Sequence, residues 1–363
     1  MRTPITARRL PAWDYPLFIT GGLLCVVSLV ALRSASATLD PLLVTRQATW
    51  IGLGILAGFV LASSPYPRWI SWGFFLYSGV LALLLVVLLA GTVKLGAARW
   101  VTIFGLSIQP AELAKLATAC GLARYLANQP VPLPTRSLLV SCVVAAVPAA
   151  FVFLQPDLGS ALVLGAIWFG MVWVAGLSIR HLRWMMAAML VVLPIAWHGL
   201  KDYQRMRLVS FVNPHADPLG AGYAIIQSQI AIGSGKLLGR GWLAGTQSQL
   251  NFLPERHADF LYAVIGEEWG FIGAVIVVGL FGVFVWRATR IALRNSEPQG
   301  RLLAMGLVSW LAFQAVMNMG MVMRVVPVVG VPLPMVSYGG SAMLVMWMAL
   351  GLLQSIHRFG TRF

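Results

Sequence analysis

Residues 252–270 read FLPERHADFLYAVIGEEWG, a charged segment that runs directly into an apolar one. The whole chain has only 11 acidic residues. Six ionisable side chains gather in this one stretch: Glu255, Arg256, His257, Asp259, Glu267 and Glu268. An acid inside a bilayer costs roughly 2.5–3.5 kcal/mol at a helix centre, so an acid kept beside an apolar run is a functional candidate. Asp259 is the first such candidate.

Outward from this stretch the chain is strongly apolar. Hydrophobic residues make up 59% of the 363 positions, charged residues only 10%, and the mean hydropathy is +0.82. Runs of about 20 apolar residues, enough to cross ~30 Å of hydrocarbon, recur along the chain. We therefore expect one integral membrane domain over residues 1–363, without a soluble module. The first run lacks a small-residue cleavage site and is expected to be kept as a span.

The apolar runs predict an all-α polytopic membrane protein with about ten transmembrane helices. Their ranges are 16–34, 48–64, 69–91, 110–127, 137–154, 158–177, 182–200, 260–286, 302–323 and 338–356. If the N-terminus lies inside, fourteen arginines, among them Arg2, Arg8 and Arg9, fall on the cytoplasmic side of the membrane. The short loops on the outer side then hold only five Lys or Arg residues. Basic loops stay in the cytoplasm, so both termini are predicted to lie inside.

A long outer loop at about 201–259 joins the seventh and eighth predicted spans. A structureless connection of this length is uncommon unless it is functional. Its middle, residues 222–233, is apolar but too short to cross, so we expect a re-entrant or interfacial helix.

Several common functions are disfavoured. The net charge of +15 is better explained by lipid headgroups and topology than by nucleic acid. Cys25, Cys120 and Cys142 fall in apolar runs and are interpreted as packing residues rather than disulfides or zinc ligands. Residues 233–236 lack the remaining positions of a phosphate-binding loop, and SYGGS at 337–341 does not match the serine-nucleophile motif.

Two polar motifs each allow a structural and a functional interpretation. Glu112 and Lys115 lie three residues apart, on one face of a helix. They form either a self-neutralising pair that packs the bundle or a cation held ready for an anionic substrate. Asp157, after Pro156, suits a helix N-cap. Its alternative roles are metal ligand or orienter of Lys115.

The long loop and the C-terminal third supply further candidates. Arg205 and Arg207 are either a solvated basic stretch or a clamp for diphosphate, whose oxygens match the planar guanidinium. The proline-rich stretch 327–341 cannot be a regular helix, and such backbone at membrane depth is tolerated where it lines a cavity. Glu267 and Glu268 are interpreted as partners in polar interhelical bonds.

Asp259 has two open interpretations. It directly precedes FLYAVIG and could cap the helix that begins there. Alternatively, with His257 two residues away and cations nearby, it could stay ionised and accept a proton from an attacking alcohol.

The motifs together closely resemble the SEDS (shape, elongation, division, sporulation) family, in particular its elongation-type members, over residues 12–357. The matching segments are QPAELAK, QPDLG, NPHADPLGAGYAIIQSQIAIGSG, GRGWLAGTQSQL, FLPERHADF and PVVGVPLPMVSYGGS. Two positions depart from the family's pattern. Ala258 stands where a threonine is usual, and Lys236 where glycine is common.

This resemblance implies a peptidoglycan glycosyltransferase of the bacterial inner membrane, with its site facing the periplasm or cell exterior. It would polymerise lipid II into β-1,4-linked strands during cell elongation and release undecaprenyl diphosphate. The family's essential acid falls on Asp259. Substrate-binding roles are expected for the remaining matched residues: Glu112, Lys115, Asp157, Arg205, Arg207 and His257.

The residues suit that chemistry. The donor already carries a good leaving group that needs charge stabilisation, and the acceptor alcohol needs a base. Asp259 as base with several cations would give single-step inversion; a retaining route would need two carboxylates within ~5.5 Å, which spacing alone leaves open. A divalent cation, Mg or Mn, could assist the diphosphate with Asp157 as its ligand. No organic cofactor is expected.

The resemblance also implies partners. A class B penicillin-binding protein would supply the transpeptidase, and other membrane proteins of the elongation complex are expected. The Gly-, Ala- and Val-rich stretches 271–285 and 302–316 are candidate docking faces for the partner's helix. Two alternatives remain: a lipid II flippase, and a non-catalytic scaffold for a partner synthase.

Overall fold

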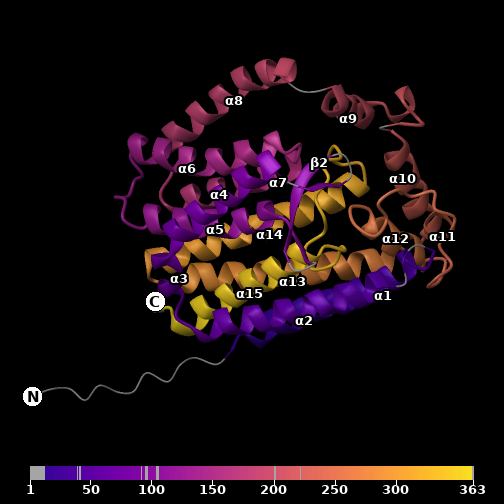
Figure 1. Cartoon of the computed structure of the whole chain (residues 1–363), viewed down its shortest axis with the longest axis horizontal. Helices are drawn as coiled ribbons and strands as arrows, with labels where there is room; N and C mark the ends of the chain where they lie inside the picture. The colour runs from indigo at the N-terminus through magenta and orange to yellow at the C-terminus, as the bar shows by residue number, and fades with distance from the viewer. Residues whose placement is uncertain are drawn as a thin grey trace, which may run out of the picture.

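The computed structural model describes residues 13–38, 40, 42–90, 92–94, 97–103, 106–199, 202–220 and 222–361. Arg2, Arg8 and Arg9, which entered the orientation argument, lie outside these residues. The described chain is a bundle of long helices lying side by side (Figure 1). In chain order, the helices are α1 (Tyr15–Ala35), α2 (Leu42–Ser63), α3 (Tyr66–Ser71), α4 (Gly73–Ala90), α5 (Pro110–Leu126), α6 (Thr135–Leu154), α7 (Leu158–Val174), α8 (Ile179–Gly199), α9 (Asp202–Val212), η1 (Pro214–Ala216), α10 (Tyr223–Gly235), α11 (Thr246–Gln249), α12 (Leu261–Glu268), α13 (Gly270–Arg294), α14 (Pro298–Val322) and α15 (Gly340–Phe359).

The predicted polytopic helical membrane fold is confirmed. Within the described residues, six helices are long and apolar enough to cross a membrane, namely α1, α2, α6, α13, α14 and α15. Shorter apolar helices cover two more predicted spans, as α4 and α7, and α5 and α8 cover the last two. Helix α10 confirms a helix in the middle of the long loop, which also holds α9, η1 and α11.

Two predicted spans are interrupted, so their continuous ranges were wrong. The span at 69–91 breaks at Trp72, between α3 and α4. The span at 260–286 breaks at Trp269, between α12 and α13. At the second break Gly270 has φ +67, and a Cβ there would lie 2.3 Å from the amide nitrogen of Gly239. Backbone from the long loop therefore occupies the place that a continuous helix would need.

A small antiparallel sheet follows α4, in a region predicted only as an outer loop. Its strands are β1 (Thr92–Lys94), β2 (Ala97–Ile103) and β3 (Leu106–Ile108), in the order β1-β2-β3. Thr92 pairs with Trp100, and Val101 pairs with Ile108. The sheet places the side chain of Arg99 near the start of α7, as described below.

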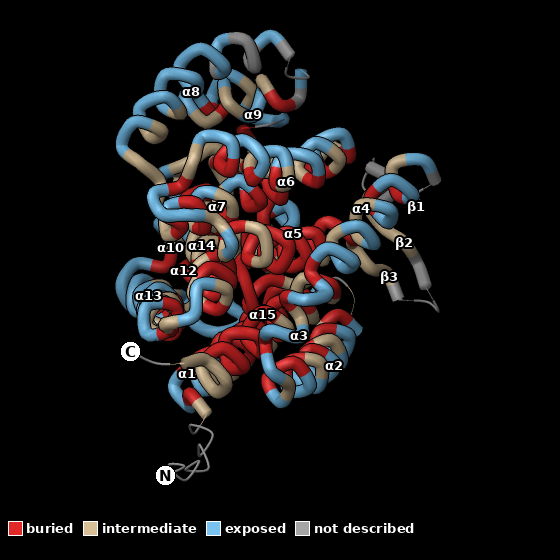
Figure 2. The backbone as a smooth tube through the Cα atoms, turned by 90° about the vertical axis from the view of Figure 1, so that its left-hand side faces the viewer, coloured by how far each residue is buried: buried red, intermediate tan, exposed pale blue. Residues whose placement is uncertain are grey.

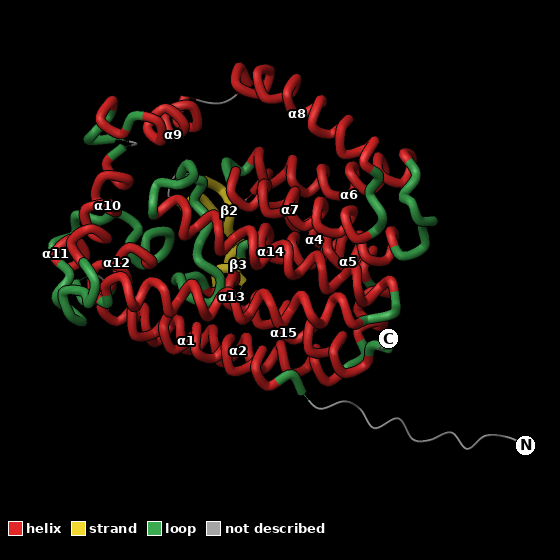
Figure 3. The backbone as a smooth tube through the Cα atoms, turned by 180° about the vertical axis from the view of Figure 1, so that it is seen from behind, coloured by secondary structure: helices red, strands yellow, loops and turns green. Residues whose placement is uncertain are grey.

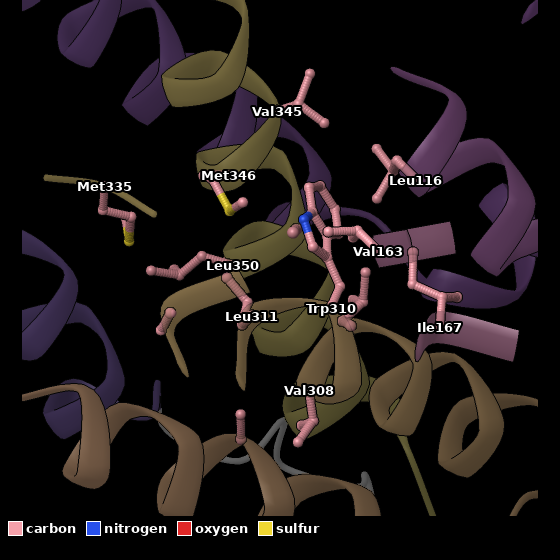
Figure 4. Close-up of a cluster of buried hydrophobic side chains, with 14 of the residues drawn as sticks. Leu116, Val163, Ile167, Val308, Trp310, Leu311, Met335, Val345, Met346 and Leu350 are labelled. Carbon is pink, nitrogen blue, oxygen red and sulfur yellow. The ribbon is translucent and has the colours of Figure 1, made fainter. Parts of the chain in front are cut away.

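Helix α14 lies inside the bundle, where it packs against α5, α7, α13 and α15 (Figure 2). The fully buried Trp310 fills the middle of this core. Around it lie apolar side chains from the neighbouring helices (Figure 4): Leu116, Val163, Ile167, Met346 and Leu350. The burial corrects one expectation, because the 302–316 stretch is mostly core and does not offer a face to a partner; α13 keeps its exposed apolar face.

Both ends of the described chain meet at one end of the bundle. The Arg358 guanidinium lies over the Trp13 ring, 4.1 Å from its centroid. Asp14 caps α1 and forms an ion pair with Arg287 of α13, at 2.6 Å. Gln354 of α15 exchanges two hydrogen bonds with the Asp14 backbone, at 3.0 and 2.8 Å. Chain ends on the same side fit an even number of crossings.

Helix α8 is the most peripheral element. It stands apart from the other long helices in two perpendicular views and is mostly exposed (Figures 1 and 2). The long loop leads from it back to the bundle through α9 and α10, and α10 packs on α12.

Candidate functional site

A polar cavity of about 350 Å³ lies at the end of the bundle opposite the chain ends. Loops and strands meet there, between α12 and α14 (Figure 3). Its lining combines charged side chains from five segments that are distant in the sequence. These are Arg99, Glu112, Asp157, Arg207, Glu255 and Asp259. Proline and glycine backbone of the 327–341 stretch forms one wall, as the sequence predicted.

The backbone around Asp259 is held by the 327–341 stretch. Asn318 of α14 donates from Nδ2 to the carbonyl oxygens of Asp259, at 2.9 Å, and Val331, at 2.7 Å. The Ser337 hydroxyl donates to the Ala258 carbonyl at 2.6 Å, and the Tyr338 amide donates to the His257 carbonyl at 2.9 Å. The bonds fix the main chain that carries the Asp259 carboxylate.

The capping interpretation of Asp259 is wrong. Helix α12 has Phe260 at its N-cap position and no capping bond from that side chain. The Asp259 carboxylate lines the cavity instead. Burial, reinforced by the nearby Glu255 carboxylate, raises the pKa of Asp259 to about 6, although the Arg207 cation acts to lower it. The carboxylate is therefore ionised at neutral pH yet basic enough to accept a proton.

Gly330 separates Asp259 from Arg207. A Cβ on Gly330 would lie 3.5 Å from Asp259 Oδ2 and 3.7 Å from Arg207 Nη1. Gly330 also has φ +71, a conformation that favours glycine. The missing side chain leaves the acid and the guanidinium facing the same small space.

Asp157 both caps α7 and lines the cavity. Its Oδ1 accepts from the Ser160 amide at 3.0 Å, and its Oδ2 accepts from Gln109 Nε2 at 3.1 Å. The described residues contain no group of three or more His, Cys, Asp or Glu arranged to hold a metal ion. A hard cation that arrives with phosphate groups needs only one or two protein carboxylates, and Asp157 retains unused lone pairs for that role.

Glu112 and Lys115 form a buried ion pair, with Lys115 Nζ 2.6 Å from Glu112 Oε1. Lys115 is 0% exposed and lies behind Glu112, outside the set of residues that line the cavity. Lys115 also donates to Gln314 Oε1 at 3.4 Å, and Gln314 donates to the Pro332 carbonyl at 2.9 Å. Glu112 Oε2 is buried without a hydrogen-bond partner in the described part of the chain. The pair therefore ties α5 to the cavity wall and leaves one carboxylate oxygen unbonded.

The other three predicted site residues, Arg205, Arg207 and His257, lie at different distances from the cavity. Arg207 lines the cavity, whereas Arg205, on the same helix, donates to the His198 carbonyl at 2.8 Å and lies 3.9 Å from Asp202. His257 lies at the edge, with its ring against Tyr338 and its Nε2 3.8 Å from Glu255 Oε2. Burial lowers the pKa of His257, which favours the neutral imidazole.

The acids in the eighth predicted span have structural roles. Glu268 accepts from the Ser34 hydroxyl of α1, which confirms an interhelical bond. Glu267 instead accepts from the backbone amides of Gln247, at 2.9 Å, and Ser248, at 3.4 Å, in the long loop.

Two residues that line the cavity, Arg99 and Gln109, and one that holds its backbone, Asn318, were not singled out from the sequence. Arg99 donates to the carbonyls of Gln155, at 2.7 Å, and Pro156, the two residues before Asp157. Gln109 is the first residue of the QPAELAK motif and could have been found from its place in that motif. The sequence around Asn318 does not predict its role, because the two carbonyls to which its amide donates belong to segments outside its own helix.

Fold and site together define a multi-pass membrane protein with an acidic and basic cavity at one end of its helical bundle. Residues 10–362 match the family of cell cycle proteins that comprises FtsW, RodA and SpoVE. The chain belongs to this family, which confirms the SEDS resemblance.

Curated relatives and solved structures agree with that placement. The chain is 40% identical to peptidoglycan glycosyltransferase MrdB of Escherichia coli strain K12, over 92% of this chain and 90% of the relative. It is 34% identical to stage V sporulation protein E of Bacillus subtilis, over 95% and 97%. A structure titled for coordination of polymerization and crosslinking by a peptidoglycan synthase complex superposes with a TM-score of 0.85 at 35% identity, covering 96% of this chain and 98% of that one. The Thermus thermophilus rod shape determining protein RodA superposes at 0.72 with 31% identity, covering 96% and 97%.

Proposed function

We propose that this chain is a peptidoglycan glycosyltransferase that polymerises lipid II at the outer face of the bacterial inner membrane, with Asp259 as general base. The class of activity is that of peptidoglycan glycosyltransferase MrdB, to which the chain is 40% identical over 90% of that relative's length. The observation that carries the residue assignment is that the Asp259 carboxylate lines the same cavity as Arg207 and Arg99. Burial, which raises the pKa of Asp259, is consistent with a role as base.

The reaction is a displacement at the anomeric carbon of the N-acetylmuramic acid unit. The 4-hydroxyl of N-acetylglucosamine forms the new C–O bond and gives its proton to Asp259, while the bond from the anomeric carbon to the diphosphate oxygen breaks. Undecaprenyl diphosphate leaves with the bonding electrons, and α becomes β. Arg207 and Arg99 would stabilise the charge that develops on the diphosphate.

A retaining route is the second mechanistic candidate. Glu255, Asp157 and Glu112 line the same cavity as Asp259, and a second carboxylate could act as nucleophile. The anomeric configuration of the product separates the routes, because only single-step inversion gives β linkages from an α donor.

Asp157 is our proposed ligand for a divalent cation that accompanies the diphosphate. Such a cation supplies Lewis-acid stabilisation of the leaving group. The residues of this chain would hold the cation with one carboxylate oxygen of Asp157 while Gln109 and Ser160 keep that carboxylate oriented.

Polymerisation suits the geometry better than flipping. A flippase needs polar groups through the membrane depth, whereas the charged lining lies at one end and the apolar core around Trp310 fills the middle (Figure 4). The deciding experiment incubates the purified chain with lipid II and separates the products on a gel. Long glycan strands support the proposal, while unreacted lipid II with transbilayer movement of a labelled analogue would support the flippase.

A single-span class B penicillin-binding protein is our proposed cross-linking partner within the elongation complex. The similarity to a structure titled for coupled polymerization and crosslinking supports this. Beyond its first turn, helix α13 presents exposed apolar side chains on which a partner helix could pack, including Ile276, Val283 and Trp286. Cysteine pairs along α13 should cross-link to the partner's helix; adducts only at other helices would move the interface.

A further inference from the structure

A second, open pocket of about 680 Å³ lies outside the catalytic cavity, in the long loop just after α10. It is lined by residues 234–240 and Ala244. The charged side chains in this lining are Lys236 and Arg240, both exposed and both cationic. The nearby acids are already engaged, since Glu268 bonds to Ser34 and Glu267 to the amides of the following turn.

The backbone fixes this pocket at the end of a membrane-spanning helix. The amides of Phe271 and Ile272, at the start of α13, donate to the carbonyls of Lys236, at 2.9 Å, and Leu237, at 3.2 Å. Helix α13 has 25 residues and is therefore about 37 Å long, slightly more than ~30 Å of hydrocarbon. This length allows its first turn, and the pocket bonded to it, to lie where hydrocarbon gives way to headgroups.

The surface around the two cations is apolar and continuous with the lipid-facing side of α13. Leu238 is 76% exposed and Phe271 63% exposed, on the two segments joined by those backbone bonds. Trp242, also exposed, donates from its indole to the Val30 carbonyl of α1 at 3.2 Å. Tryptophan and basic side chains beside exposed leucines are the residues that settle at a headgroup boundary.

We propose that Lys236 and Arg240 bind the phosphate of an anionic phospholipid in the outer leaflet, whose acyl chains lie along Leu238 and the first turns of α13. Two cations at the edge of an apolar surface match a ligand that carries one phosphate above two hydrocarbon chains. A zwitterionic lipid offers the same chains and phosphate but adds a cation that Lys236 and Arg240 would repel. Selectivity should therefore follow headgroup charge.

The test places a fluorophore at the pocket and a quencher in the lipid. Leu238→Cys, labelled with a small fluorophore, is reconstituted into bilayer discs containing brominated phosphatidylglycerol or brominated phosphatidylcholine. Quenching against mole fraction gives the relative binding constant of each lipid. We expect phosphatidylglycerol to be preferred about tenfold, and Lys236→Gln/Arg240→Gln to abolish the preference.

Two variants control for charge and folding. Arg180→Gln/Arg183→Gln removes the same charge from exposed residues on α8 and should leave the preference unchanged. Lys236→Arg/Arg240→Lys keeps the charge and should retain it. Equal quenching by both lipids, no quenching by either, or a preference that survives Lys236→Gln/Arg240→Gln would each overturn the proposal. Loss of the preference on adding inorganic phosphate would also overturn it, because it would mark a site for free anions.

Discussion

The two ends of the bundle each hold a buried aspartate that caps a helix, and the two aspartates differ in what else they meet. At the chain-end side, Asp14 caps α1 and receives two bonds from the Arg287 guanidinium, at 3.2 and 2.6 Å. At the cavity side, Asp157 caps α7 and receives its other bond from the neutral Gln109. The carboxylate of Asp14 forms an ion pair with Arg287, whereas the hydrogen bonds to the carboxylate of Asp157 come from neutral groups in the described part of the chain.

This difference separates structural from functional use of the same residue type. A bidentate Arg partner satisfies a buried carboxylate and closes the space around it. A carboxylate with only neutral partners, beside an open cavity, keeps its charge available to a ligand. The same contrast distinguishes Glu268, bonded to α1, from Asp259, whose carboxylate faces solvent-accessible space.

The largest effect on turnover is expected at Asp259. Asp259→Asn keeps the shape and removes the base, so polymerisation of lipid II should fall by about 10²–10⁴-fold. The Asn318 and Ser337 bonds go to backbone carbonyls and should persist, so the melting temperature should stay unchanged. Near-normal polymer from this variant would remove Asp259 from the mechanism.

The buried pair on α5 gives the next largest effect. Lys115→Met leaves Glu112 uncompensated at the cavity wall, where its charge would repel diphosphate, and turnover should fall by about 10²-fold. Glu112→Gln leaves Lys115 charged and should cost less. Both variants are to be compared as folded, inserted protein. Wild-type polymerisation by Lys115→Met would show that the pair only packs the bundle.

The pH profile should show the titration of Asp259. Because burial raises its pKa to about 6, the base is ionised above this pH and protonated below it. Turnover should therefore be level at neutral pH and fall about tenfold per unit below about pH 6. Arg207→Gln removes a cation that lowers this pKa, so its midpoint should move to higher pH. A profile flat to pH 5 in the unmodified chain would contradict the assignment.

The two capping aspartates can be compared directly through Asn, which keeps capping ability. Asp157→Asn removes charge from the cavity, and turnover should fall roughly tenfold with little change in stability, if the charge binds a cation as proposed. Asp14→Asn should leave turnover per folded molecule unchanged and cost roughly 3 kcal/mol of unfolding free energy, because Arg287 loses its ion pair. A loss of turnover in Asp14→Asn with a loss of stability in Asp157→Asn would contradict the functional role of Asp157 and the structural role of Asp14.

The sequence predicted the bundle because apolar run length is a local property, and it singled out Asp259 because an acid beside an apolar run is unusual. It could not predict the break at Trp269 or the burial of Lys115, since both depend on segments far away: residues 236–241 in one case and Gln314 in the other. The sheet at 92–108 is too short to show a periodic pattern. Of the Arg205 and Arg207 pair, only the three-dimensional path of α9 decides which side chain reaches the cavity.

The interruption of the eighth predicted span limits which insertions and deletions the long loop can accept during evolution. At the break, the carbonyls of Glu267 and Glu268 accept from the amides of Arg240 and Gly241, both at 3.0 Å, while residues 236–237 satisfy the first amides of α13. The loop thus completes two helix ends at once, so its length is set by the gap it fills. An inserted or deleted residue at 236–241 would leave four backbone groups unbonded next to the bilayer. Among the described residues, a change of length at 217–220 would break only the backbone bonds that the amides of Gly222 and Tyr223 donate to the Asp217 and Gly220 carbonyls, in an exposed turn where water can replace them. Natural length variation in the long loop should therefore gather before α10 and avoid the segment after it.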